Sequence, residues 1–238
     1  MSLQALIFDL DDTLMDTHGQ LVMDAHHQAC LAMQRAGLDF PLEELFAARL
    51  HFLKTQPRED VNTLMVEHFG HHDPRIIQAG HDTFLNPEIG DIDVFAGVPE
   101  LLENLKQHYA LFLVTAGFKT AQSKKIQVLG IGHHFKEILI IEPGSPGGKK
   151  AAFIEIKERY QYHFEQMLII GDRISNEIKA GNQLGCPTFW VQHGECAHDL
   201  PANHEEEPTW QSQSVLDVQS ILSHPYVLSP SSAAPISS

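Results

Sequence analysis

Three carboxylates crowd a short stretch near the N-terminus, ALIFDLDDTLMD, in which Asp9, Asp11 and Asp12 follow an apolar run. Charges of one sign this close together repel, so the stretch requires a cation or a proton to hold it. In an extended segment Asp9 and Asp11 point to one side and Asp12 to the other, because successive side chains alternate. Two carboxylates in different surroundings can act separately, one as a nucleophile and the other as a general acid.

Residues suited to binding a phosphate group or a metal ion also follow later apolar runs. They are Thr115, Ala116 and Gly117 after the second run, Lys149 and Lys150 after the third, and Gly171 and Asp172 after the fourth. Because ligands of parallel sheets bind at the carboxyl ends of the strands, we expect these residues to converge on one edge. A carboxylate pair, a hydroxyl and a lysine could hold Mg²⁺ and a phosphate group there, with Asp9 and Asp172 as metal ligands.

Five short apolar runs predict the strands that must position these residues. The runs are 5–8, 111–115, 138–141, 167–170 and 187–191. Strands that are apolar at nearly every position suit a parallel sheet covered on both faces. The helical periodicity between them predicts an α/β fold with a Rossmann-like, doubly wound parallel sheet.

The stretch between the first two runs has helical periodicity and no convincing strand. We predict that 19–88 form an α-helical cap domain inserted into the α/β core. The core would comprise 1–18 and 89–225, and the small polar residues and prolines of 226–238 predict a disordered tail. Residues 16–19 and 91–97 are then the expected hinges.

Composition limits the partners. The formal net charge of -15 argues against nucleic acid and against an anionic membrane surface, since both would be repelled. No apolar run reaches the length of a membrane span, and the early Asp9 leaves no room for the apolar region of a signal peptide. Three dispersed cysteines fit the reducing cytoplasm. A small phosphorylated metabolite remains the expected partner, and the choice between monomer and homodimer stays open.

Several conspicuous side chains have an ordinary explanation. The sequence has sixteen histidines, and adjacent ones point to different sides of a helix, so we expect pairs such as His133–His134 to be solvated rather than to bind zinc. The group His193, Cys196 and His198 lacks a fourth ligand. The cap cations could contact a second anionic group of a substrate, although a solvated face is the favoured interpretation; they are Arg49, Lys54 and Arg58.

Taken together, DLDDT, LVTAG, a lysine after the third strand and IIGDRISNEIKAG resemble the haloacid dehalogenase superfamily of phosphohydrolases, over about residues 3–195. The resemblance implies that Asp9 attacks phosphorus and forms an aspartyl-phosphate. It implies that Asp11 protonates the leaving group, then activates water, and offers its backbone carbonyl to Mg²⁺. Thr115 matches the residue that binds the phosphoryl oxygens, together with backbone N–H groups of the loop that begins at Ala116 and Gly117.

The lysine of the third motif matches Lys149 or Lys150, and Lys149 is preferred because it lies four residues before Phe153, which begins a helical stripe. The loop before it lacks the family's usual Lys-Pro pair. Asp172 matches a metal ligand of the fourth motif. Glu177 matches the second acid of that motif, which is commonly Asp, and the extra methylene can be accommodated if the group acts on the metal through water.

The presence of Asp11 favours phosphoryl transfer over dehalogenation, because the dehalogenases of this superfamily lack the second aspartate. We therefore expect Mg²⁺-dependent hydrolysis of a small phosphate monoester. A phosphomutase would use the same residues, and a non-catalytic scaffold would keep phosphate and Mg²⁺ affinity without turnover. The complete set of chemical groups argues against the scaffold. The helical insert is expected to close over the pocket and select the leaving group.

Overall fold

The chain forms two compact units in the computed structural model, which describes residues 2–85 and 89–223. Met1–Asp16 together with Asp93–Ser238 make the core unit, and Thr17–Ile92 make the cap unit. The predicted disordered tail, 226–238, lies outside the described residues. None of the described helices combines the length and the hydropathy that a membrane span needs.

The core unit contains a six-stranded sheet in the order β3-β2-β1-β4-β5-β6, in which every pairing is parallel. The strands are β1 Ala5–Phe8, β2 Ala110–Ala116, β3 Glu137–Ile141, β4 Met167–Gly171, β5 Thr188–Val191 and β6 Trp210–Ser212. This confirms the predicted parallel α/β fold. The sequence analysis missed β6, because this short strand at the sheet edge lacks the continuous apolar run of a buried strand.

Strand β1 lies between the two strands that matter most for the site. Phe8, its last residue, is in register with Leu113 of β2 and with Ile170 of β4. The backbone N–H of Asp9 then donates to the carbonyl of Ile170 over 2.9 Å. The ends of β1 and β4 are thereby held next to each other, and β2 ends on the other side of β1.

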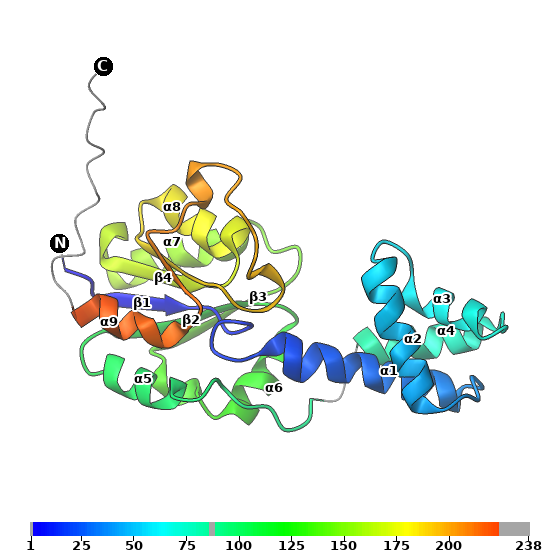
Figure 1. Cartoon of the computed structure of the whole chain (residues 1–238). Coiled ribbons are helices and arrows are strands. Elements are labelled where there is room, and N and C mark those ends of the chain that lie inside the picture. The colour runs from blue at the N-terminus through cyan, green and yellow to red at the C-terminus, as the bar shows by residue number, and fades with distance from the viewer. Residues whose placement is uncertain (1, 86–88, 224–238) are drawn as a thin grey trace, which may run out of the picture. The chain divides into compact units, whose positions relative to one another are not determined.

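Helices cover both faces of this sheet (Figure 1). Helices α5 (Val98–Leu105) and α6 (Lys119–Leu129) lie on one face, and α7 (Gly148–Tyr160) and α8 (Lys179–Leu184) lie on the other. The chain of the described core ends with α9, Val218–Ser223. Apolar side chains of β1, β2 and β4 pack with Phe153 and Ile156 of α7 into one buried cluster. Burial of both sheet faces explains why these strands are apolar at nearly every position.

The cap unit is entirely helical in its described part. A π-helical turn, His18–Val22, leads into α1 Met23–Arg35, α2 Leu42–Thr55, α3 Val61–His68 and α4 Pro74–Leu85. Their apolar faces form one cluster that includes Met33, Leu45 and Met65. The side chain of Asp60 accepts hydrogen bonds from the backbone N–H groups of Asn62 and Thr63 and so caps α3.

The two segments that lead into and out of the cap pair with each other inside the core unit. Met15 and Val94 form an antiparallel bridge, and the N–H of Phe95 donates to the carbonyl of Leu14 over 2.9 Å. The two segments therefore start from one common position of the core unit. The role of 16–19 and 91–97 as hinges stays a prediction.

Arg49 is fully buried in the core of the cap, so the expected solvated face is wrong for this residue. Its Nε donates to His26 Nδ1 over 3.0 Å and its Nη1 donates to Asn62 Oδ1 over 2.7 Å. Burial, followed by the charge of Arg49, lowers the pKa of His26 to about 4, so His26 is neutral and can accept this bond. Lys54 and Arg58 are exposed, as a solvated face requires.

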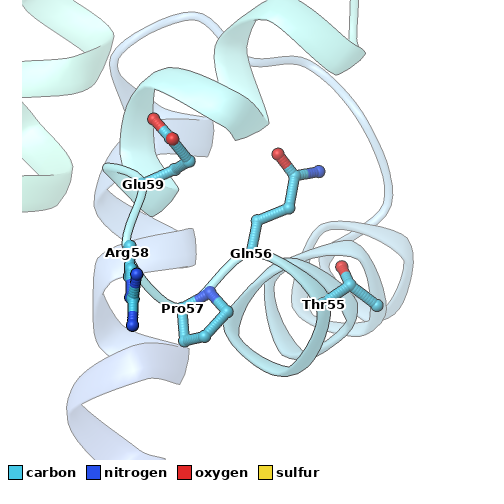
Figure 2. A pocket seen from close by; sticks show the side chains of 5 residues that line it. All are labelled: Thr55, Gln56, Pro57, Arg58 and Glu59. Atoms are coloured by element: carbon cyan, nitrogen blue, oxygen red, sulfur yellow. The ribbon is translucent and has the colours of Figure 1, made fainter.

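Arg58 lies in a surface hollow of about 310 Å³ that is lined by five consecutive residues, Thr55, Gln56, Pro57, Arg58 and Glu59. All five are exposed. Figure 2 shows that Arg58 points away from Gln56 and Glu59 instead of converging with them. The hollow is the concave side of the loop between α2 and α3, and it assembles no chemical groups from different elements.

Replacing Arg49 by Ala should destabilise the cap unit by about 3 kcal/mol or more. The change removes a buried side chain and leaves the acceptors of His26 and Asn62 unpaired, and each unpaired buried group costs roughly 1–3 kcal/mol. Urea unfolding followed by circular dichroism measures this loss. Arg58→Ala removes an exposed arginine from the same unit and should change stability by less than about 0.5 kcal/mol. Equal effects of the two variants would contradict the structural role of Arg49.

Candidate active site

Three buried carboxylates surround one buried ammonium at the carboxyl end of β1. Asp9, Asp172 and Glu177 each place an oxygen within 4.8 Å of the others, and we call these three residues the acidic cluster. The Nζ of Lys149 lies 2.7 Å from Asp9 Oδ1 and also pairs with Glu177 Oε1. All four residues are at most 5% exposed. Residues from β1, β4 and α7 therefore meet at one edge of the sheet, as the strand-end argument predicts.

The local fold after β4 explains how two of the acids come together. Asp172 follows the strand directly, and Glu177 lies in a π-helical turn, Ile174–Ile178, that brings its side chain back toward the strand end. A side chain at Gly171 would meet Glu177 Cγ at 2.7 Å, so only glycine leaves room for this approach. Glu177 Oε2 accepts from the N–H of Arg173, and Trp190 Nε1 donates to the carbonyl of Asp172 over 2.7 Å.

The charges of the acidic cluster are not balanced by the protein. Burial raises the pKa of Asp9, and although Lys149 lowers it, repulsion from Glu177 and Asp11 adds to the increase. Burial, followed by the charges of Asp9 and Glu177, raises the pKa of Asp172. Burial lowers the pKa of Lys149, but the attraction of Asp9 and Glu177 outweighs it and keeps this pKa above its usual value. If all of them are ionised, the three carboxylates and one ammonium carry two negative charges in excess, and the raised pKa values of Asp9 and Asp172 show that the protein alone does not stabilise this state.

This arrangement fits a divalent cation. Its donors are carboxylate oxygens, which Mg²⁺ prefers, and the excess charge equals that of one such ion. Asp9 Oδ1 is buried and lies 2.7 Å from Lys149 Nζ without the geometry of a hydrogen bond, and it is a candidate oxygen ligand for the ion. The residues that would hold the ion are Asp9 and Asp172, with Glu177 beside them.

Of the two candidate lysines, Lys149 is the one that the structure brings to Asp9. Both lie in the first turn of α7, but they point in different directions because they are adjacent on a helix. Lys149 is buried among the acidic cluster, whereas Lys150 is half-buried and donates to Gln183 over 2.8 Å.

Thr115 is fully buried near the end of β2, the strand beside β1. The backbones of the two residues after Thr115 form hydrogen bonds within the protein. Ala116 is the last residue of β2 and its carbonyl accepts from Gln122, and the N–H of Gly117 donates to the carbonyl of Ile141 over 2.9 Å. The expected contact of the Gly117 N–H with a phosphoryl group would require this bond to β3 to open.

Asp11 is held by two residues of α6 that the sequence analysis did not single out. Lys125 Nζ lies 2.5 Å from Asp11 Oδ1, and Gln122 Nε2 donates to Asp11 Oδ2 over 2.7 Å. Gln122 also reaches Thr115 Oγ1 over 3.0 Å. A signal was available, because Gln122 and Lys125 lie three residues apart on the helix face that also buries Ile126. Polar residues on a core-facing stripe have partners inside the protein.

The expectation that the paired histidines are solvated is wrong for His134 and for His26, which are both buried. His133 and His134 do not point apart as expected, since they lie on a 3₁₀ turn and their ring centroids are 3.9 Å apart. Together with Glu103 they could approach one ion, although Glu103 already pairs with Lys106 over 2.6 Å. His193 lies 3.4 Å from Asp16 Oδ1, in a group that does not include Cys196 or His198.

The core unit is thus an α/β fold with an acidic, lysine-containing centre at the edge of its sheet. A family model of haloacid dehalogenase-like hydrolases matches residues 3–185. The chain belongs to this family, which confirms the resemblance found in the motifs.

Similar proteins cover nearly the whole chain. A glyceraldehyde 3-phosphate phosphatase of Methanopyrus kandleri is 29% identical and aligns over 91% of this chain and 97% of its own. Pyrimidine 5'-nucleotidase PynA of Streptococcus pneumoniae is 25% identical, over 90% and 92%. The crystal structure of YfnB from Bacillus subtilis, named as a HAD-hydrolase and bound to magnesium, has a TM-score of 0.62 at 23% identity and covers 93% of this chain and 99% of its own.

Replacing Lys149 by Met in metal-free protein should cost about 3–5 kcal/mol of stability, because breaking a buried ion pair leaves the partner charges uncompensated. Urea unfolding in the presence of EDTA measures this loss. Lys150→Met removes the adjacent ammonium, which lies outside the acidic cluster on a half-buried residue, and should cost less than about 0.5 kcal/mol. A larger loss for Lys150→Met would show that the other lysine balances the acidic cluster.

Proposed function

We propose that the protein is a Mg²⁺-dependent phosphatase that hydrolyses a small phosphate monoester through an aspartyl-phosphate on Asp9. The observation that carries the proposal is the acidic cluster, in which Asp9 keeps a buried oxygen without a well-oriented hydrogen bond beside Lys149. A carboxylate in that position can act as a nucleophile, because the buried ammonium offsets the repulsion from an incoming phosphate.

The similar proteins support the same chemistry. Glyceraldehyde 3-phosphate and a pyrimidine nucleoside 5'-phosphate, the substrates that their names imply, are both small phosphate monoesters. The two leaving groups differ greatly in shape, a triose in one case and a nucleoside in the other. We therefore propose the phosphate-monoester class of substrate and not a particular metabolite.

The proposed reaction has two steps, and residues of the core unit carry out both. In the first, an oxygen of Asp9 forms a bond to phosphorus, the bond from phosphorus to the ester oxygen breaks, and Asp11 gives that oxygen a proton. In the second, Asp11 takes a proton from water, and the water oxygen displaces Asp9 from phosphorus. Phosphate leaves and both carboxylates return to their starting forms. Lys149 and Thr115 would bind the phosphoryl oxygens in both steps.

A bound Mg²⁺ would add charge neutralisation of the phosphate and of the acidic cluster. Asp9 and Asp172 would supply carboxylate ligands and Asp11 its backbone carbonyl. Glu177 would hold the ammonium group of Lys149 in place, because the two side chains already form an ion pair.

Asp9→Asn should lower turnover of p-nitrophenyl phosphate by about 1,000-fold or more, because the amide removes the nucleophile of the first step. Steady-state kinetics with Mg²⁺ measure the loss, and circular dichroism shows whether the variant is folded. Asp39→Asn, which changes an exposed aspartate of the cap, is the matched control and should keep full turnover. Substantial activity of folded Asp9→Asn would overturn the proposed nucleophile.

Mg²⁺ should raise the melting temperature of the protein, since a ligand at a hundred times its dissociation constant adds about 2.7 kcal/mol of stability. For a chain of this size the expected rise is about 5 °C or more. Asp172→Asn should melt higher than the wild type in EDTA, because one of the repelling charges is gone, and should lose most of the rise with Mg²⁺. Thermal scans of both proteins with and without Mg²⁺ provide the test, and an unchanged rise in the variant would place the ion elsewhere.

A further inference from the structure

Helix α6 presents two buried polar side chains to the proposed general acid. Gln122 is 3% exposed and Lys125 is 8% exposed, and they lie three residues apart and so on one face of the helix. Burying a lysine removes its water and restricts a flexible side chain, so the position needs a compensating partner. Asp11 provides it, with its Oδ1 at 2.5 Å from Lys125 Nζ.

Gln122 connects Asp11 to the phosphate-binding end of β2. Its Nε2 lies 2.7 Å from Asp11 Oδ2, 3.0 Å from Thr115 Oγ1 and 2.7 Å from the carbonyl of Ala116. The loop leaves room for this amide, because a side chain at Gly117 would meet Gln122 Nε2 at 2.9 Å. The same amide therefore contacts the proposed acid, the expected phosphate-binding hydroxyl and the backbone carbonyl of the residue after that hydroxyl.

We infer that Gln122 and Lys125 are positioning residues for Asp11, and we call the two together the α6 bracket. Lys125 holds one oxygen of the Asp11 carboxylate, and Gln122 holds the other at a set place relative to Thr115. The inference rests on the proposed function, since Asp11 needs a defined position only if it transfers a proton to and from the reacting oxygens. Neither residue is required to touch the substrate.

Precise placement of Asp11 matters because a general acid contributes about 10²–10⁴-fold to rate only when it is within hydrogen-bond reach of the leaving oxygen. Asp11 follows the end of β1, so the sheet orients its backbone but not its carboxylate. The α6 bracket supplies the missing constraint from a rigid helix. Removing it should affect the protonation of the leaving group more than the binding of the phosphate.

Two aryl esters separate these effects. The p-nitrophenolate group leaves phosphorus without needing a proton, whereas the more basic phenolate of phenyl phosphate needs one. The value of kcat/KM reports the reaction only as far as the formation of the aspartyl-phosphate. In Lys125→Met, kcat/KM for phenyl phosphate should fall about 10-fold or more, and that for p-nitrophenyl phosphate should fall less than about 3-fold.

Further variants separate positioning from folding. Lys124→Met changes the adjacent, exposed lysine of α6 and should leave both kcat/KM values unchanged. Lys125→Arg keeps the charge and should recover part of the loss on phenyl phosphate. Gln122→Met removes the amide at similar length and should show the same preference for the ester with the better leaving group. Asp11→Asn removes the acid itself, so the difference between its kcat/KM losses on the two esters is the largest expected. Thermal unfolding shows that each variant is folded.

The outcomes distinguish the inference from the proposed function. Wild-type turnover that requires Asp9, with the larger loss on phenyl phosphate in Lys125→Met and Gln122→Met, supports the α6 bracket. Equal losses on both esters, or no loss on either, would overturn it and leave the phosphatase proposal standing. Absence of wild-type turnover on both esters would overturn the phosphatase proposal and the positioning role with it.

Discussion

The excess of buried negative charge at the end of β1 is the constraint on which the rest of the site depends. Burying carboxylates without partners is costly, so a fold that gathers Asp9, Asp172 and Glu177 must also supply positive charge. Lys149 supplies part of it from α7. The imbalance that remains explains why this edge of the sheet is suited to a divalent cation and to an anionic substrate together.

The strand order places this charge where the chain can use it. In the order β3-β2-β1-β4-β5-β6, the chain continues from β1 to its neighbour β2, and from β4 to its neighbour β5 in the opposite direction along the sheet. The strand order therefore reverses between β1 and β4, and ligands of such sheets bind at the carboxyl ends of the strands beside this point. Asp9 directly follows β1 and Asp172 directly follows β4, so both carboxylates lie there.

Local features on either side of β1 position the side chains of the site. The π-helical turn after β4 returns Glu177 to the strand end, and the missing side chain of Gly171 allows the approach. On the other side of β1, the α6 bracket contacts both oxygens of the Asp11 carboxylate. The cap unit has its own buried network around Arg49, so it is held together by packing and hydrogen bonds that are separate from those of the core unit.

The parallel sheet, the helical segment between its first two strands and the acids after the strands could all be predicted from the amino-acid sequence. These features depend on local patterns, since apolar runs report burial and the residues after each run must lie at one edge of the sheet. Three facts became visible only in the folded chain: Lys149 is the lysine that contacts Asp9, Arg49 is buried, and Gln122 and Lys125 contact Asp11. These facts arise from contacts between residues far apart in the chain, and a periodic pattern within one segment contains no information about the partner on another.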